Sequence, residues 1–415
     1  MSEAAEKGKK AKNISMALAK KTTEEKNKAL LAVARVLLED RETIISENKK
    51  DLRSGSRAGL PENILDRMML NEKRIHDMSE AVRLLVKLKD PVGETVEEIK
   101  KENGLLILKK KVPVGVIGMI YEARPNVTAD AATLAIKTGN AVILRGSSSS
   151  ICSNQALVSS IHRALAETGF PEDAVQLIED TGREAATEMF HLRDYLDVLI
   201  PRGGKKLIDT VVREASVPVI ETGAGNCHLY IDETAQPEMA VRIAVNAKTQ
   251  RPSVCNAIET LLIHAQWLAR HGEKLLSALA EKGVEIYGDE PVQKIFPAAK
   301  MAAEEDWYCE YLALKISVKT VEDTDEAIRH INRYGTKHSE AIVTEDGARA
   351  EHFMSMVDAA CVYHNASTRF TDGFEFGYGA EIGISTQKLH ARGPMGLDAL
   401  TSTKYWIYGS GQIRE

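Results

Sequence analysis

The feature that most constrains the fold is a regular alternation of short apolar segments with helix-forming ones, which begins near Val112. The apolar segments cover residues 114–120, 141–144, 174–178, 197–200 and 217–220. Helices are expected between them, over residues 127–138, 153–168, 183–190 and 205–214. Continuous apolar strands that alternate with helices are typical of a parallel sheet covered on both faces. The pattern therefore predicts an α/β fold with a doubly wound sheet.

A second α/β stretch runs from about Leu229 to Ala391. Its expected strands are residues 313–318, 341–344 and 360–364, and its expected helices are residues 267–282, 324–334 and 347–356. The apolar run from Ile258 to Ile263 fits either a buried strand or a buried helix, because periodicity alone does not separate the two. Residues 365–396 are predicted to form a polar, glycine-containing loop, and a loop of that length inside a compact domain is usually functional or disordered.

The remaining segments of the chain differ in composition. Residues 1–96 are predicted to be mainly helical, and a capping box formed by Thr22 and Glu25 would start one of the helices. Residues 97–111 combine apolar residues with flanking Lys and Glu, which favours an exposed strand or hairpin. Because an isolated hairpin is barely stable, we expect this segment to pair with another part of the protein or with another subunit. The apolar, aromatic tail from Thr401 is a candidate partner strand.

Composition and charge exclude several classes of protein. The 415 residues carry a net charge of −6, so no basic face of the kind that binds nucleic acid is expected. No apolar run reaches the length of a membrane span, and the N-terminal residues lack the apolar core of a secretory signal. The five cysteines include no C-x-x-C pair, which argues against a disulfide framework and against a zinc site. We therefore expect a cytoplasmic protein that holds no metal ion.

One cysteine occupies a setting that suits chemistry. Cys255 follows a turn at Arg251–Ser253 and precedes the apolar run that starts at Ile258. A thiol between a turn and a buried element can be held firmly and still face a cleft. The thiolate is the nucleophilic form, and the nearby cations Lys248 and Arg251 would favour it. Taken alone, however, such a cysteine is more often a small buried hydrophobe.

Two turns at strand ends suit the binding of phosphate. Arg145-Gly146-Ser147 and Arg202-Gly203-Gly204 each place Arg and Gly where a predicted strand ends and a helix follows. Backbone N–H groups and a helix N-terminus attract anions at such positions, although ordinary turns between strand and helix have the same composition. The chain contains no G-x-G-x-x-G, so a dinucleotide would have to be bound in another way.

Several dispersed motifs point to a known family. They are Val112-Pro-Val-Gly-Val-Ile-Gly118, Tyr121-Glu-Ala-Arg-Pro-Asn-Val-Thr128, Ile143-Leu-Arg-Gly-Ser147, Asp197-Val-Leu-Ile-Pro-Arg-Gly-Gly204, Tyr334-Gly-Thr-Lys-His-Ser-Glu340 and the long segment 365–396. With Cys255 in its setting, the chain resembles the γ-glutamyl phosphate reductases (glutamate-5-semialdehyde dehydrogenases), a branch of the aldehyde dehydrogenase superfamily. The last two motifs are distinctive of this branch, and the match extends along nearly the whole chain.

This resemblance implies a fold and a reaction. The fold would have two doubly wound, Rossmann-like domains and a small β flap for oligomerisation. The implied parts are an NADP-binding domain (1–96 and 112–228), a catalytic domain (229–396) and the flap (97–111 and 397–415). The implied reaction is the reduction of L-glutamate 5-phosphate by NADPH to L-glutamate 5-semialdehyde with release of phosphate, on the route to proline. A homo-oligomer is expected, and glutamate 5-kinase is a candidate partner because the acyl phosphate is unstable.

The resemblance also implies roles for residues near the substrate. Cys255 would attack the acyl phosphate and form a thioester. Asn126 would hold the oxyanion together with the N–H of Cys255. Ser367 and Arg369 follow the position where the superfamily lines its substrate pocket, and Arg124 is a second candidate. An arginine is suited to these positions because its guanidinium forms paired hydrogen bonds with a carboxylate.

The implied cofactor site draws on the two turns described above. Arg145 matches a basic residue that the superfamily places near the adenosine ribose, and an arginine there suits the 2′-phosphate of NADP. The carboxylate of Glu310 would orient the nicotinamide ribose. The full set of residues expected to bind the cofactor is Arg145, Gly146, Ser147, Gly203, Gly204 and Glu310.

One motif departs from the superfamily pattern. Oxidative members carry a general-base Glu in a Glu-x-Gly-Gly motif, whereas this chain has Glu221-Thr-Gly-Ala-Gly225, with Ala224 in place of the second glycine. Reduction of an acyl phosphate needs no hydrolytic water, so Glu221 receives no catalytic role. The alternative is an oxidative NAD(P)-dependent aldehyde dehydrogenase that uses Glu221 as its base. A protein of this fold without turnover is a further alternative, and the role of His338 stays open between packing and acid–base chemistry.

Overall fold

The computed structural model describes residues 2–414, which divide by their internal contacts into two units. The first unit comprises residues 2–221, 377–383 and 395–414, and the second comprises residues 222–376 and 384–394. This division lies before the domain boundary predicted at 228/229, and it assigns residues 377–383 to the first unit. Within residues 2–414, no helix is long and apolar enough to cross a membrane. The same residues contain no group of three or more His, Cys, Asp or Glu that could hold a metal ion.

The N-terminal part of the first unit is helical, as the sequence predicts. Its helices are α1 (Glu3–Leu18), α2 (Thr23–Glu39), α3 (Arg41–Arg57), α4 (Glu62–Met68) and α5 (Glu72–Lys87). The predicted capping box is confirmed, because Thr22 Oγ1 accepts the N–H of Glu25 at 3.2 Å and the Glu25 carboxylate accepts the N–H of Thr22 at 2.8 Å. These two bonds satisfy N–H groups that would otherwise lack partners at the start of α2.

The first unit is built on a buried parallel sheet of four strands, in the order β5-β4-β3-β6. The strands are β3 (Val116–Tyr121), β4 (Ala141–Arg145), β5 (Val175–Leu177) and β6 (Val198–Arg202). The helices that follow them are α6 (Asn126–Lys137), α7 (Ile151–Thr168), α8 (Arg183–Met189) and α9 (Lys205–Glu214). Helices α6 and α7 pack on the sheet and are covered in turn by α2, whereas α1 packs directly on β3, β4 and β5. The predicted alternation of strand and helix is confirmed.

The prediction of a strand over residues 217–220 is wrong. This segment makes a single bridge, from Val219 to Leu199 of β6, and is otherwise irregular. The N–H of Leu199 donates to the carbonyl of Pro218 at 2.8 Å and the N–H of Ile220 donates to the carbonyl of Leu199 at 3.0 Å, but Pro218 has no N–H with which to extend the pairing toward Val217. A regular ladder therefore does not extend along the segment, although its residues are apolar enough for one.

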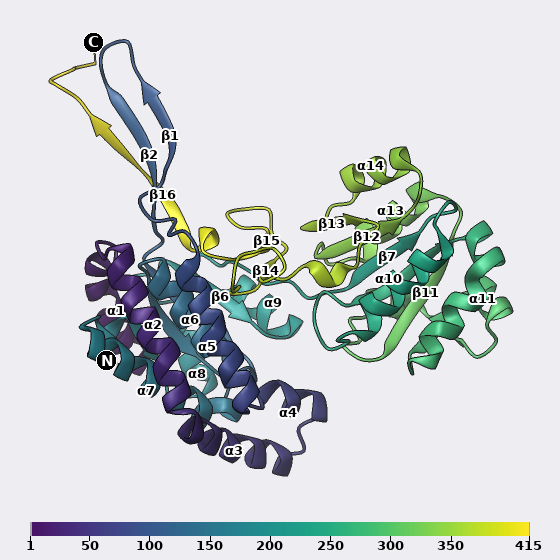
Figure 1. Ribbon diagram of the computed structural model, residues 1–415, viewed down its shortest axis with the longest axis horizontal. Coiled ribbons are helices and arrows are strands. Elements are labelled where there is room, and N and C mark those ends of the chain that lie inside the picture. The colour runs from purple at the N-terminus through teal and green to yellow at the C-terminus, as the bar shows by residue number, and fades with distance from the viewer. Residues whose placement is uncertain (1, 415) are drawn as a thin grey trace. The chain divides into compact units, whose positions relative to one another are not determined.

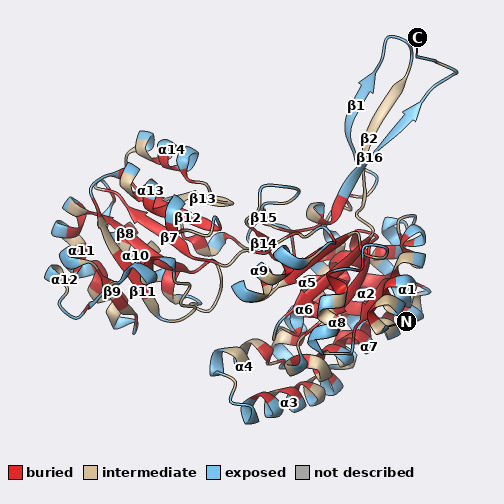
Figure 2. Ribbon diagram, turned by 180° about the vertical axis from the view of Figure 1, so that it is seen from behind, coloured by how far each residue is buried: buried red, intermediate tan, exposed pale blue. Residues whose placement is uncertain are grey.

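The segments 97–111 and 401–408 pair as the sequence suggests. Strands β1 (Thr95–Lys100), β2 (Leu106–Pro113) and β16 (Thr401–Tyr408) form an antiparallel sheet in the order β1-β2-β16, here called the terminal sheet. Trp406 lies opposite Leu108, and Ile99 lies opposite Ile107. The sheet projects from the helices of the first unit (Figure 1), and most of its surface is exposed or half-buried (Figure 2).

The second unit contains a parallel sheet of seven strands in the order β10-β9-β11-β8-β7-β12-β13. The strands are β7 (Cys227–Ile231), β8 (Ile258–His264), β9 (Glu285–Gly288), β10 (Lys300–Met301), β11 (Lys315–Val321), β12 (Ser339–Val343) and β13 (Cys361–His364). The run from Ile258 to Ile263 is therefore a strand rather than a helix. The helices of this unit are α10 (Pro237–Thr249), α11 (Ala265–Glu281), α12 (Glu290–Ile295), α13 (Thr324–Tyr334) and α14 (Gly347–Met356).

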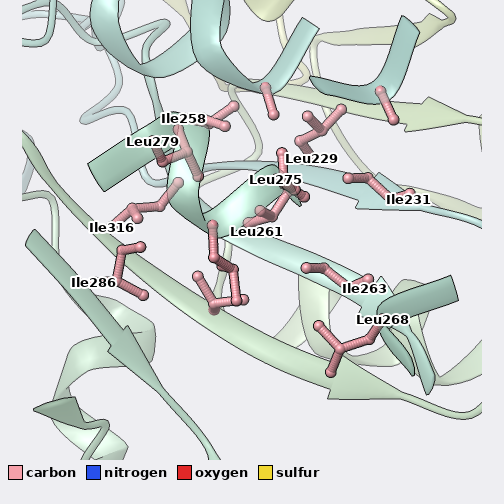
Figure 3. Close-up of a cluster of buried hydrophobic side chains, with 14 of the residues drawn as sticks. Leu229, Ile231, Ile258, Leu261, Ile263, Leu268, Leu275, Leu279, Ile286 and Ile316 are labelled. Carbon is pink, nitrogen blue, oxygen red and sulfur yellow. The ribbon is translucent and has the colours of Figure 1, made fainter. Parts of the chain in front are cut away.

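Both faces of this sheet are covered, which explains why its strands are continuously apolar. Leu229 and Ile231 point to one face, where they join Leu275 and Leu279 of α11 in a fully buried cluster (Figure 3). Tyr230, between them in sequence, points to the other face and packs with residues of α13 and α14. Burial of each large apolar side chain contributes about 1.5–3 kcal/mol, so these two layers supply much of the stability of the unit.

The long predicted loop, residues 365–396, is irregular over most of its length. It contains one short antiparallel pair, β14 (Ile384–Ser385) with β15 (Gly393–Pro394), and a single turn of 3-10 helix from Thr368 to Phe370. Its final part is fixed to the second unit by Asp358, which binds Lys388 at 3.2 Å and Arg392 at 2.7 Å. The loop is thus largely ordered by its contacts rather than by regular secondary structure.

Candidate active site

Cys255 lies in the turn between α10 and β8, at the amino end of a central strand of the second unit. It is half-buried. Neighbouring strand β7 begins at Cys227 beside it, and the Cys227 thiol donates to the carbonyl oxygen of Cys255 at 3.1 Å. The backbone of the candidate nucleophile is therefore tied to the amino end of the neighbouring buried strand.

A glycine lets another backbone approach the nucleophile closely. A Cβ atom on Gly225 would lie only 1.5 Å from the carbonyl oxygen of Cys255, so no other residue fits there without moving one of the two backbones. The N–H of Gly225 donates to Glu310 Oε1 at 2.6 Å. Glu310, which the sequence predicts as a cofactor residue, thus binds the backbone segment that packs on Cys255. The glycines of the Glu221–Gly225 motif had not been predicted to serve this purpose.

The two predicted substrate residues of the second unit lie beside the same turn. Thr368 Oγ1 donates to the carbonyl of Asn256 at 2.6 Å, and Asn256 Nδ2 donates to the carbonyl of Thr371 at 2.8 Å. These bonds tie the segment that carries Ser367 and Arg369 to the residue that follows the nucleophile. Ser367 Oγ accepts the N–H of Arg369 at 3.3 Å.

The charge of Arg369 is close enough to the nucleophile to affect it. Arg369 Nε donates to Gln250 Oε1 at 2.7 Å, which ties the guanidinium to the residue at the end of α10, before the turn that carries Cys255. Burial lowers the pKa of Arg369, and the negative charge of an ionised Cys255 thiol acts against that shift. Arg369 thus supplies a positive charge near Cys255.

Lys248 has a different role from the one predicted. Its ammonium group is fully buried and forms an ion pair with Glu259 of β8, and it also donates to the carbonyl of Ile258 at 3.0 Å. Burial raises the pKa of Glu259 to about 7, against the opposing effect of Lys248. Glu259 Oε1 accepts the N–H of Leu312 at 3.1 Å. The ion pair therefore fixes the segment that carries Glu310. The positive charge of Lys248 is paired with the carboxylate of Glu259.

The predicted phosphate-binding turns of the first unit meet at the carboxyl edge of its sheet. Strand β3 lies between β4 and β6, so the turns that start at Arg145 and Arg202 flank the turn that follows Tyr121. The N–H of Ala123 donates to Ser147 Oγ at 3.4 Å. The structure thus brings Gly146, Ser147, Gly203, Gly204 and Arg124 to one edge.

One of these turns already binds an anion of the protein. The N–H of Gly204 donates to the carboxylate of Glu122 at 2.8 Å, and a Cβ atom on Gly203 would lie 2.6 Å from the same oxygen. A phosphate bound by this N–H would have to displace Glu122. The turn at Gly146 and Ser147 has no such carboxylate contact among the described residues, so it is the better of the two candidates for phosphate.

Arg145 is partly buried at the start of that turn. Its Nη2 atom donates to the carbonyls of Thr181 and Gly182 at 2.6 and 2.9 Å, whereas its buried Nε has no hydrogen-bond partner among the described residues. Burial lowers the pKa of Arg145, and Asp180 only partly offsets this. A desolvated guanidinium with an unsatisfied N–H donor is suited to binding an anion, such as the 2′-phosphate of NADP.

Asn126 begins α6 of the first unit and is exposed. Its amide donates to Asp130 Oδ2 at 3.0 Å. Burial raises the pKa of Asp130 to about 6, while Asn126 and Arg202 lower it. The role of Asn126 as an oxyanion donor stays a prediction, since Asn126 belongs to the first unit and Cys255 to the second.

His338 is part of the buried packing near the nucleophile. Its Nδ1 lies 2.8 Å from Ser339 Oγ and 3.7 Å from the sulfur of Cys227, and the residue is fully buried. These contacts fit the packed, hydrogen-bonded alternative for His338, whose role stays a prediction. Glu221 is the last residue of the first unit before the chain enters the second, and Ala224 is half-buried.

Comparison with known proteins places the chain in a family. The aldehyde dehydrogenase family profile matches residues 1–294 and 315–405. The γ-glutamyl phosphate reductases of Bacillus subtilis and Oceanobacillus iheyensis are 63% and 60% identical over 415 residues, covering all of each chain. The crystal structure of the Thermotoga maritima γ-glutamyl phosphate reductase is 48% identical, superposes with a TM-score of 0.96 and covers both chains completely.

More distant structures share the fold. The Saccharomyces cerevisiae γ-glutamyl phosphate reductase is 31% identical with a TM-score of 0.57, and it covers 100% of this chain and 99% of that one. A propionaldehyde dehydrogenase from Rhodopseudomonas palustris is 16% identical with a TM-score of 0.72, covering 97% and 96%. The predicted aldehyde-dehydrogenase-like fold is confirmed, and the chain belongs to the aldehyde dehydrogenase family and, within it, to the γ-glutamyl phosphate reductases.

Proposed function

We propose that the protein reduces L-glutamate 5-phosphate to L-glutamate 5-semialdehyde with NADPH and releases phosphate, in the biosynthesis of proline. Full-length identity of 60% or more to reductases of this name supports the reaction. The observation that carries the proposal is the setting of Cys255, a half-buried thiol with a fixed backbone and a nearby arginine charge. This setting suits a nucleophile better than it suits a residue that only fills space.

The chemistry assigned to Cys255 is acyl transfer. Its thiolate attacks the acyl carbon, a sulfur–carbon bond forms, and the bond between that carbon and the phosphate oxygen breaks, so inorganic phosphate leaves. NADPH, when bound, supplies the hydride that converts the thioester into the aldehyde. Asn126 and the N–H of Cys255 are the proposed donors to the oxyanion, and loss of one such donor would raise the barrier by about 3 kcal/mol.

The cofactor of the family is a nicotinamide dinucleotide, and we propose that this protein prefers NADPH. Arg145, with Gly146 and Ser147, is proposed to hold the 2′-phosphate. Gly203, Gly204 and Glu310 complete the proposed set, although Gly204 and Glu310 already bind other groups of the protein.

The residues proposed to bind the substrate are chosen for their charge. Arg369 and Arg124 are candidates to bind the α-carboxylate of the substrate, and Ser367 lies beside Arg369. Further proposals are a cytoplasmic location, a homo-oligomer that uses the terminal sheet, and delivery of the labile substrate by a glutamate 5-kinase.

The oxidative alternative with Glu221 as base is not favoured by the relatives, which carry the name of the reductase. The reverse reaction separates the two readings. Reduction of NADP⁺ by glutamate semialdehyde, supplied in its cyclic form, would be measured with and without phosphate for the wild type and for Cys255→Ala. We expect activity that requires both phosphate and Cys255. Activity that persists without phosphate would instead assign the oxidative reaction.

A further inference from the structure

The peptide bond between Cys255 and Asn256 is held by two groups of the segment 225–227. The backbone of Gly225 packs against the Cys255 carbonyl so closely that a side chain would overlap it, and the Cys227 thiol donates to the same carbonyl oxygen. Glu310 fixes Gly225 by accepting its N–H.

The sulfur of Cys227 is well prepared to act as a donor. The residue is fully buried at the start of β7, and burial raises the pKa of its thiol, so the proton stays on the sulfur at neutral pH. The backbone of Ser339 contributes a hydrogen bond to Cys227, and His338 Nδ1 lies 3.7 Å from its sulfur. Of these neighbouring atoms, the Cys255 carbonyl oxygen at 3.1 Å lies nearer to the sulfur than His338 Nδ1 does.

The position of this carbonyl affects the nucleophile and the substrate segment together. A peptide bond is planar, so fixing its oxygen fixes the backbone rotation that follows the Cα of Cys255. Asn256, on the far side of the same peptide, holds Thr371 and accepts from Thr368. A small rotation of the peptide would move the sulfur of Cys255 relative to the segment that carries Arg369.

We infer that Cys227 is a positioning residue, which holds the Cys255 peptide in the orientation needed for acyl transfer by donating a hydrogen bond to its carbonyl oxygen. This inference rests on the proposed function, in which Cys255 is the nucleophile. Misplacement of a reacting group by about 1 Å can lower a rate by about a hundredfold, so a single hydrogen bond at this peptide can control the rate without touching the substrate.

The test uses three variants. Cys227→Ala removes the donor, and Cys227→Ser keeps a donor of similar size. Ile263→Val is the matched control, because it removes buried volume at the opposite end of β8 from Cys255. Each protein would be assayed for kcat and KM in the phosphate-dependent reaction, and for the rate at which p-nitrophenyl acetate acylates Cys255, read as release of nitrophenolate. The second assay needs neither the glutamyl substrate nor the cofactor.

We expect Cys227→Ala to lower kcat and the acylation rate by about tenfold or more, with KM changed by less than about twofold. Cys227→Ser should recover both rates to within about threefold of the wild type, and Ile263→Val should match the wild type. Equal rates for Cys227→Ala and the wild type would overturn the inference, as would a serine variant as impaired as the alanine one. If the wild type lacks phosphate-dependent activity, the proposed function fails, and the acylation rates still decide the inference.

Discussion

At the scale of single residues, charged side chains that are only partly desolvated account for most of the specificity proposed for cofactor and substrate. Arg145 combines two backbone contacts, an unsatisfied buried Nε and a pKa that burial lowers. A bound phosphate would accept a hydrogen bond from that Nε and would counter the lowering of the pKa. Hydrogen bonds to charged groups contribute about 1.5–3 kcal/mol, which corresponds to a change in affinity of about ten- to a hundredfold.

The first prediction concerns cofactor choice. Arg145→Ala should raise the KM for NADPH by about tenfold or more and leave the KM for NADH within about threefold, because only NADPH carries the 2′-phosphate. Initial-rate measurements with both cofactors would check this. Arg163→Ala, which removes an exposed arginine bound to Glu39, is the control and should leave both values unchanged. An equal loss with NADPH and NADH would refute the assignment.

The second prediction concerns the stability of the first unit as a function of pH. Burial raises the pKa of Asp130 from 3.8 to about 6. The folded protein therefore binds this proton more tightly than the unfolded chain, so the contribution of Asp130 to the free energy of unfolding falls as pH rises from about 4 to about 6. Between pH 4 and pH 7 the wild type should lose about 1–3 kcal/mol more than Asp130→Asn does.

Urea denaturation of both proteins across this range would measure that difference. Asp209→Asn, which removes an exposed carboxylate bound to Lys205, should follow the wild type. The same pH dependence for Asp130→Asn and the wild type would show that Asp130 titrates normally.

At the scale of secondary structure, strands buried on both faces were the most predictable from sequence. β3 and β4 follow the predicted apolar runs to within two residues at each end, and helices α13 (Thr324–Tyr334) and α14 (Gly347–Met356) have the predicted bounds. The segment 217–220 is equally apolar, but the strand predicted there does not form because of Pro218. The contacts of Gly225 and Cys227 with Cys255 could not be predicted. They join the amino ends of two strands that lie apart in sequence, and such contacts leave no periodic pattern. The burial of Lys248 was not predicted either, because a lysine is almost never fully buried unless it is paired and the sequence does not reveal its partner Glu259.

The third prediction concerns the terminal sheet. A chain that stops after Leu400 lacks β16, so β2 loses the partner that spans its whole length from Leu106 to Pro113. The remaining two-stranded hairpin should be only marginally stable. Hydrogen exchange of residues 95–113 should therefore become much faster, while exchange of the buried strand β4 stays slow. Unchanged protection of residues 95–113 would show that the hairpin is stable by itself.

At the scale of the whole molecule, the proposed nucleophile and all of the proposed cofactor residues except Glu310 belong to different units. Arg145 and Ser147 lie in the first unit, and Cys255 and Arg369 lie in the second. Each set could be recognised from sequence by its motif. The arrangement of the two sets had to come from the resemblance, because no periodicity or spacing encodes it.

The fourth prediction follows from this division. A ligand that binds the folded state stabilises the part that holds it. NADP⁺ alone should therefore slow hydrogen exchange most in the first unit, at the turns that follow β3 and β4. Exchange measured by mass spectrometry with and without NADP⁺ would locate the effect, and Arg145→Ala should weaken it. Protection confined to the second unit would contradict the assignment of the cofactor site.

The chain crosses between the two units at residues 221/222, 376/377, 383/384 and 394/395. On the ribosome, β2 emerges early, whereas β16 emerges only after the entire second unit has been synthesised. Until then the edge of β2 has no strand to pair with, and the charged residues of this hairpin protect it from pairing with other nascent chains. If the proposed homo-oligomer associates through the terminal sheet, that association waits until the second unit has been synthesised, and chains truncated before β16 would be left out of it.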